Sequence, residues 1–97
     1  MTTKATYLPK RIKVSVTADD ITNGVKDNCK LCPIALAVVR LLPQSDAIVS
    51  YHSCAIRSGQ PVPPWVKYKL SQSAKHFVRR FDNGLSVKPA TFIFERS

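Results

Sequence analysis

Three cysteines and one histidine have the types, and part of the spacing, of a metal site. The run Cys29-Lys30-Leu31-Cys32 places two thiols within reach of one metal ion, or of each other. A closed zinc site needs four ligands, and His52 and Cys54 of a predicted hairpin would complete it. On an extended chain these two side chains point the same way, because they lie two positions apart. The sequence therefore allows a zinc site at Cys29, Cys32, His52 and Cys54, if the hairpin lies over the start of the following helix.

Two other interpretations of the cysteines stay open. Cys29 and Cys32 would form a redox pair if the dipole of a helix starting after Cys32 favoured its thiolate. A strand running directly into the motif, as in thioredoxin-like proteins, is missing, because residues 23–28 read as a polar loop. Alternatively, Cys32 and Cys54 are small buried residues and Cys29 is incidental, since free cysteine is among the most buried residue types. We favour this structural interpretation and expect no cofactor.

Basic residues alternate with apolar ones along two predicted strands, residues 10–17 and 65–70. If both strands share a sheet that helices cover on one face only, the basic side chains meet on the open face. Cations beside an exposed aromatic ring are typical of single-stranded nucleic acid binding, where phosphates meet the cations and a base stacks on the ring. The alternative is an ordinary solvated face whose charges deter edge-to-edge pairing. The candidates are Arg11, Lys13, Trp65, Lys67 and Lys69.

A second basic cluster lies on a predicted helix at residues 72–82. It comprises Lys75, His76, Arg79 and Arg80. We include Lys75, Arg79 and Arg80 among the nucleic-acid-binding candidates, although no helix-turn-helix or zinc-finger spacing accompanies them. A solvated helix face is the better-supported alternative.

No residue pattern typical of catalysis is present. Of the six carboxylates, Asp19, Asp20 and Asp82 lie at predicted helix caps or ends, and the others have no partner histidine nearby in the sequence. There is no phosphate-cradling glycine loop and no Ser-His-Asp order. We therefore expect a protein that is not an enzyme.

The elements that must position these residues surround one apolar run. From Pro33 to Leu42 every residue except Arg40 is apolar, so a helix there has no polar stripe and must be enclosed on nearly all sides. Pro33 suits the first helical position, and Pro43 ends the helix. We expect this buried helix to be the centre of the core.

Strands and short helices are predicted on both sides of the central helix. Thr17 is a good N-cap for a short turn that ends at Asn23-Gly24, and Asn83-Gly84 ends the amphipathic helix over residues 72–82. Besides residues 10–17 and 65–70, strands are expected at residues 46–51, 53–57 and 91–95, and a proline-rich turn at residues 58–64. The predicted fold class is α+β, a mixed and mostly antiparallel sheet of about five strands with a buried central helix and one amphipathic helix.

Length, composition and charge limit the function classes. Ninety-seven residues make a single domain over residues 1–97, with a loose leader at residues 1–9, and 44% hydrophobic residues are typical of a globular protein. The first ten residues hold no signal-peptide block and no apolar run is long enough to span a membrane, so we expect a cytoplasmic protein. The net charge of +9 predicts attraction to polyanions such as nucleic acid, an acidic protein face or anionic lipid. It excludes a protein that imitates the phosphate backbone of DNA.

Several motifs resemble those of a group of small uncharacterised phage and prophage proteins. They are Ala18-Asp19-Asp20-Ile21 with Gly24, Cys32-Pro33-Ile34-Ala35-Leu36-Ala37, Phe77-Val78-Arg79-Arg80-Phe81-Asp82-Asn83-Gly84 and Val87-Lys88-Pro89-Ala90-Thr91-Phe92. Three of these motifs read as a helix cap, a core-helix start and a helix stop, so they carry over no catalytic residue. The resemblance implies a phage genome as the source, where small accessory proteins commonly bind host machinery, defence complexes or nucleic acid.

These observations predict a small basic accessory protein of phage type, in the host cytoplasm, that binds nucleic acid or a nucleic-acid-containing complex without catalysis. One alternative is an inhibitor that docks on an acidic face of a host or anti-phage defence protein. The other is a zinc-binding or thiol-redox module built on Cys29 and Cys32.

Overall fold

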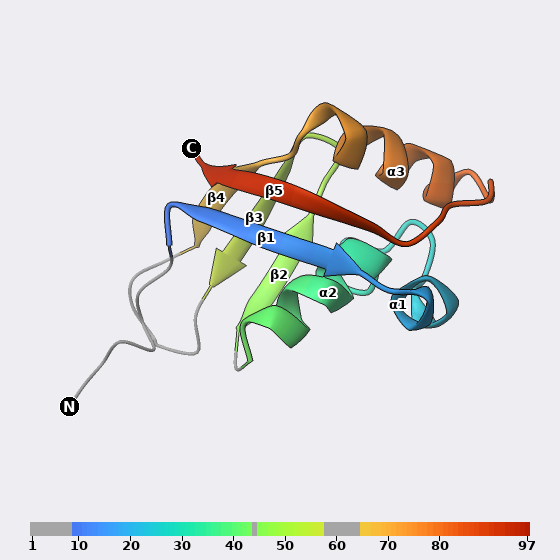
Figure 1. Cartoon of the computed structure of the whole chain (residues 1–97), viewed down its shortest axis with the longest axis horizontal. Coiled ribbons are helices and arrows are strands. Elements are labelled where there is room, and N and C mark those ends of the chain that lie inside the picture. The colour runs from blue at the N-terminus through green and yellow to red at the C-terminus, as the bar shows by residue number, and fades with distance from the viewer. Residues whose placement is uncertain (1–8, 44, 58–64) are drawn as a thin grey trace.

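The computed structural model describes residues 9–43, 45–57 and 65–97 (Figure 1). In chain order these residues form β1 (Arg11–Val16), α1 (Ala18–Asn23), α2 (Pro33–Leu41), β2 (Asp46–Val49), β3 (Ser53–Arg57), β4 (Val66–Lys69), α3 (Gln72–Asp82) and β5 (Ala90–Arg96). The predicted α+β class is confirmed, and each predicted element lies within a few residues of its expected bounds. The proline-rich turn at residues 58–64 and, apart from Pro9, the leader at residues 1–9 lie outside the described residues.

All the described strands pair in one curled sheet, in the order β1-β5-β4-β3-β2. The sequence predicted a mixed sheet, but every pair is antiparallel. β5 lies between β1 and β4, and its register with β1 runs from Arg11 opposite Glu95 to Val16 opposite Ala90. In Figure 1 the long pair of β1 and β5 lies in front, with β2 and β3 behind it. The two ends of the described chain are therefore neighbours in the sheet.

One face of the sheet, called here the inner face, forms the core. Alternate side chains of β1 are buried, and the same alternation continues across the other strands. The buried inner-face residues are Ile12, Val14, Val16, Ala47, Val49, Cys54, Ile56, Tyr68, Phe92 and Phe94. Buried side chains of α2 and α3 belong to the same cluster. Both helices therefore pack on the inner face, and the opposite face, called the outer face, has no described helix over it.

α2 lies between the two edge strands of the sheet. It packs against both β1 and β2. The loop before α2 contacts β2, where the N–H of Val49 donates to the carbonyl of Cys29 at 2.8 Å. At the other end, Nη2 of Arg40 donates to the carbonyl of Ser15 in β1, also at 2.8 Å. α2 and its flanking loop thus satisfy backbone groups at both edges, which would otherwise be open to pairing with another chain.

The start of α2 is as predicted, but its enclosure is not. Pro33 is the first helical residue, and Sγ of Cys32 caps the helix by accepting from the N–H of Ala35 at 3.5 Å. The prediction that nearly all sides are enclosed is wrong, because Val39 is 38% exposed and Leu41 45%. α2 covers one side of the sheet and therefore turns one of its own sides outward.

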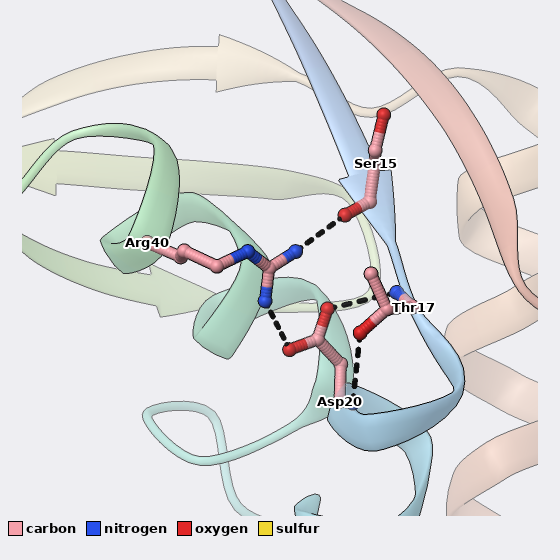
Figure 2. A network of polar contacts seen from close by, with 4 residues as sticks. All are labelled: Ser15, Thr17, Asp20 and Arg40. Atoms are coloured by element: carbon pink, nitrogen blue, oxygen red, sulfur yellow. Dashed lines mark hydrogen bonds and ion pairs between the residues drawn. The ribbon is translucent and has the colours of Figure 1, made fainter.

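α1 is fixed by a capping box and an ion pair (Figure 2). Oγ1 of Thr17 accepts from the N–H of Asp20 at 3.2 Å, and Oδ2 of Asp20 accepts from the N–H of Thr17 at 2.9 Å. Oδ1 of Asp20 accepts from Nη1 of Arg40 at 2.5 Å. Together with the bond from Arg40 to Ser15, this network joins β1, α1 and α2 through side chains.

α3 packs on the inner face through the predicted stripe. Ala74, Phe77 and Val78 are buried, and Ser71 caps the first turn through the N–H of Ala74. The chain leaves the helix at Gly84, whose φ of 77° is the left-handed conformation expected there. None of the helices in the described ranges is long and apolar enough to cross a membrane.

Candidate functional site

The outer face brings together the basic residues that the sequence predicted there. Arg11 and Lys13 project from β1, Lys67 and Lys69 from β4, and all four are exposed. Their buried neighbours on the same strands point to the inner face, because side chains alternate along a strand. β5 separates the two pairs of cations, so they flank one strand without being in direct contact.

One row across the outer face contains an acidic residue between two cations. Glu95 of β5 lies opposite Arg11 on one side and opposite Lys69 on the other. Nη2 of Arg11 is 2.6 Å from Oε2 of Glu95, and both side chains are well exposed, at 67% and 60%. An exposed ion pair of this kind adds little to stability. Its effect is on charge, because it neutralises one cation of the outer face.

Trp65 lies at the other end of the outer face in contact with an arginine that sequence reasoning missed. Cζ of Arg57 is 4.9 Å from the centre of the Trp65 ring, a cation–π contact. Nη2 of Arg57 is also 3.0 Å from Oδ2 of Asp46, the residue opposite it on β2. The strand parity of residues 53–57 could have placed Arg57 on this face. Trp65 is thus a half-buried ring held by a cation, and the surface beside it combines a flat aromatic group and a guanidinium.

The basic residues of α3 form a separate surface. Arg79 and His76 are exposed, and Lys75 and Arg80 are half-buried. Arg80 donates from Nη2 and Nε to the carbonyl of Ser86, at 2.9 and 3.2 Å. Because α3 packs on the inner face, its cations and those of the outer face lie on opposite sides of the sheet. The structure therefore divides the predicted nucleic-acid-binding residues into two groups.

The four predicted zinc ligands do not come together. Within the part of the chain that the structure describes, no three His, Cys, Asp or Glu side chains are grouped closely enough to hold a metal ion. The expectation that His52 and Cys54 point the same way is wrong, because His52 lies in the exposed turn before β3 while Cys54 is fully buried. The zinc hypothesis stays a prediction, tested by elemental analysis and by melting after chelation.

The three thiols are free and differ in their surroundings. Cys29 is exposed, whereas Cys32 and Cys54 are buried in the core. Burial raises the pKa of the Cys32 thiol, and it raises the pKa of Cys54 to about 12, with a smaller contribution from Cys32. Both buried thiols therefore stay protonated at neutral pH, and a neutral thiol is a poor nucleophile and metal ligand.

A cavity of about 290 Å³ opens beside Cys29. The residues that line it include Cys32, Tyr51, Asp27 and Asp82. The negative charge of Asp82 raises the pKa of Tyr51, followed by a smaller effect of burial. Oδ1 of Asp82 also accepts from the N–H of Asp27 at 3.0 Å, which holds that residue at a φ of 56°. This acidic wall is unsuited to a polyanion, in contrast to the outer face.

No family model, curated protein or solved structure matches the chain. The proposal for its function therefore depends on the geometry of its own residues.

Proposed function

We propose that the protein binds single-stranded nucleic acid on the outer face of its sheet. The observation that supports this most is the gathering of Arg11, Lys13, Lys67 and Lys69 on the one face without a described helix. The overall charge of +9 adds a long-range attraction to polyanions. The two acidic residues that project from described strands on this face, Glu95 and Asp46, are each paired with an arginine, so the lysines set its net charge.

A single strand suits this surface better than a duplex. The outer face is a sheet without a projecting helix, whereas a helix or a narrow ribbon is what enters the major groove of DNA. Splayed bases stack on aromatic rings and on guanidinium planes, and Trp65 with Arg57 offers both at one end of the face. The phosphates would then follow the lysines of β4 toward β1. The resemblance to phage and prophage proteins adds the expectation of an accessory role in the cytoplasm of an infected host.

Fluorescence anisotropy with a mixed-sequence, single-stranded oligonucleotide tests the proposal. Affinity should fall steeply as salt rises, because binding releases counterions from the phosphates. The double variant Lys67→Glu/Lys69→Glu should lose most of the affinity. The slope of log affinity against log salt concentration should also become shallower by about two, one for each lost phosphate contact. Absence of binding by the unmodified protein at low salt would overturn the proposal.

Two further double variants separate local contacts from net charge. Lys26→Glu/Lys30→Glu makes the same charge change at exposed residues of the loop before α2, outside the outer face, and should weaken binding much less. Equal losses from both variants would mean that charge alone, and not the outer face, determines affinity. The variant Lys75→Glu/Arg79→Glu measures whether the cations of α3 contribute.

The rival function is inhibition of a host or defence protein through an acidic surface that meets the same cations. It predicts one stable protein partner in affinity purification that survives nuclease treatment. Partners that disappear after nuclease treatment would instead support nucleic acid as the ligand.

A further inference from the structure

β5 extends well beyond the strand that flanks it on one side. β4 pairs with β5 at Tyr68 opposite Arg96 and Lys69 opposite Glu95, and the chain then turns into α3. On its other side, β5 pairs with β1 over its first six residues. From residue 90 to residue 94, β5 therefore has a strand partner on one side only, within the described ranges.

The register shows which backbone groups face the open side. The N–H of Arg96 donates to the carbonyl of Lys10, just before β1, at 2.8 Å, and the N–H of Ser97 donates to the carbonyl of Lys67 in β4 at 2.9 Å. Consecutive residues of an antiparallel strand bond to alternate neighbours. The even-numbered residues of β5 thus bond toward β1, and the odd-numbered residues present their N–H and C=O toward the side of β4.

Thr91 and Ile93 are the odd-numbered residues beyond the end of β4. Their backbone groups face the space where β4 would have continued, and both residues are exposed. No strand among the described residues bonds to them there. A row of unpaired backbone donors and acceptors is the feature to which an additional strand binds.

An open cavity of about 400 Å³ lies between α3 and β5, beside this open backbone. Phe77 of α3 and Phe92 of β5 form its floor, with ring centres 5.5 Å apart and planes at 73°. Val87 and Ala90 form the adjoining wall. The cavity is therefore apolar at its base and has the size of a site for one large side chain or a small ligand.

The rim of the cavity is basic. Lys88 and His76 are exposed beside it, and Arg80 lines it while bonding to the carbonyl of Ser86. No acidic side chain is among the described residues that line it. A ligand that places an apolar group on the floor and a carboxylate at the rim would match both features.

We propose that an extended, acidic segment of a partner protein adds to the sheet along residues 91–93 of β5. Its backbone would pair with the odd-numbered residues of β5. Its residue opposite Phe92 would then lie in a non-hydrogen-bonded pair, with its side chain on the inner face above Phe77. That position takes an aromatic or branched apolar side chain, and an Asp or Glu two positions away, on the same face of the added strand, lies near Lys88 or Arg80. The cavity of this site lies on the inner face, whereas the cations proposed to bind nucleic acid project from the outer face.

Selection from a displayed library of random twelve-residue peptides tests the proposal, with the full chain as bait and the variant Ala90→Trp for counter-selection. The tryptophan fills the cavity and leaves the backbone of β5 in place. Enriched peptides should contain an apolar residue with Asp or Glu two positions away, so that both side chains lie on the same face of the added strand. Absence of peptides that prefer the unmodified chain over Ala90→Trp would overturn the proposal.

An enriched peptide, made synthetically, then maps the site by fluorescence anisotropy. Lys88→Glu should weaken binding about tenfold, as expected when a charge-assisted contact is replaced by repulsion. Lys30→Glu makes the same charge change in the loop before α2, outside the cavity lining, and should leave affinity within about twofold. Equal losses from the two variants would show a charge effect without a site, and would contradict the proposal.

Hydrogen exchange of individual backbone amides, followed by NMR, tests whether the peptide binds as an added strand. In the peptide complex, the amides of Thr91 and Ile93 should become protected from hydrogen exchange, while the β1-paired amide of Phe92 changes little. Protection of Thr91 and Ile93 without peptide, if it disappears on dilution, would mean that a second copy of the chain occupies this edge, and would contradict the proposal. Unchanged exchange at both residues in the complex would exclude strand addition.

Discussion

The guanidinium of Arg40 and the carboxylate of Asp20 form an ion pair in which one partner is buried and the other is not. Nη1 and Oδ1 are 2.5 Å apart, and the Asp20 side chain is 6% exposed whereas that of Arg40 is 50% exposed. Arg40 thus approaches from the solvent side and closes over a carboxylate in the corner between β1 and α1 (Figure 2). The second terminal nitrogen of Arg40, Nη2, donates a hydrogen bond to the carbonyl of Ser15.

Replacing Asp20 should therefore destabilise the fold more than replacing its neighbour. Asp20→Ala removes the ion pair and half of the capping box, and should lower the free energy of unfolding by about 1–3 kcal/mol. Asp19→Ala makes the same charge change in the same helical turn at an exposed residue, and serves as the control. Urea denaturation measures both, and equal losses would mean that the network contributes nothing beyond charge.

The pKa of Asp20 in the folded protein predicts how the free energy of unfolding depends on pH. Burial by itself would raise the pKa of Asp20, but the hydrogen bonds from Arg40 and from the N–H of Thr17 outweigh it and hold the pKa below its ordinary value of 3.8. A lowered pKa in the folded state means that the unfolded chain binds the proton more readily. The contribution of Asp20 to the free energy of unfolding is therefore complete above pH 3.8, and it is lost as the pH falls through the folded-state pKa of Asp20.

Urea unfolding at pH 6 and pH 3 tests the direction of this pH dependence. The unmodified protein is compared with the variant Asp20→Asn, whose side chain does not titrate. The stability difference between the unmodified protein and Asp20→Asn should be larger at pH 6 than at pH 3. A difference that grows toward low pH would contradict the assigned direction.

Gly24 should be required for steric reasons. Its φ is −70°, which any residue adopts, but a Cβ there would lie 2.7 Å from Cδ and Cγ of Pro33 and 2.9 Å from the carbonyl of Asp20. Gly24→Ala must push α1 away from the start of α2, at a cost of about 1–3 kcal/mol. Asn23→Ala, at the exposed neighbouring residue, is the control, and a thermal melt of both variants compares them. An unchanged melting temperature for Gly24→Ala would show that the two helices separate freely.

The cysteines should react at very different rates. A thiol reagent at neutral pH should modify Cys29 quickly, and Cys32 and Cys54 only on unfolding, because burial and a raised pKa keep both as neutral thiols. Cys29→Ser should abolish the fast phase. Two fast thiols in the native protein would instead support the redox pair of Cys29 and Cys32.

Neutralising Glu95 should strengthen nucleic acid binding, if the outer face is the binding surface. Glu95→Gln removes the negative charge between Arg11 and Lys69, so affinity at low salt should rise severalfold, about the effect of one added ion contact. The melting temperature should change little, because the pair with Arg11 is exposed. The matched variant Asp82→Asn, away from the outer face, should raise affinity less. Equal gains from the two variants would argue against this surface.

Local patterns were sufficient to predict the elements and the faces of the strands. Pro33 and Thr17 mark their helix starts through local chemistry, and the alternation of β1 separates Lys13 from Val14 without knowledge of the fold. The exposed side of α2 was not predictable, because composition alone does not show whether a helix is surrounded or covers an edge. Val39 and Leu41 are exposed because α2 spans β1 and β2.

The candidate sites were harder to predict than the elements, because they depend on contacts between residues far apart in the sequence. Strand parity correctly placed Lys67 and Lys69 on the outer face, but parity cannot tell where a strand ends, so it misplaced His52 in the turn before β3. The separation of the α3 cations from the outer face followed only from the packing of α3. The cavity over Phe77 and Phe92 had no signal in the sequence, because its lining comes from α3 and from residues 86–92, which only the packing of α3 on the sheet brings together.

The place of β5 in the strand order has a consequence for how the chain folds. Because β5 lies between β1 and β4, the β2-β3-β4 meander forms from local contacts, but among the described strands β1 has no partner until residues 90–96 have been synthesised. The contact between Arg11 and Glu95 joins residues 84 positions apart. Closing so long a loop has a high entropic cost, so this contact forms late in folding. During translation α2 can cover the apolar side of β1, but the backbone of β1 has no described strand partner until the last strand emerges from the ribosome.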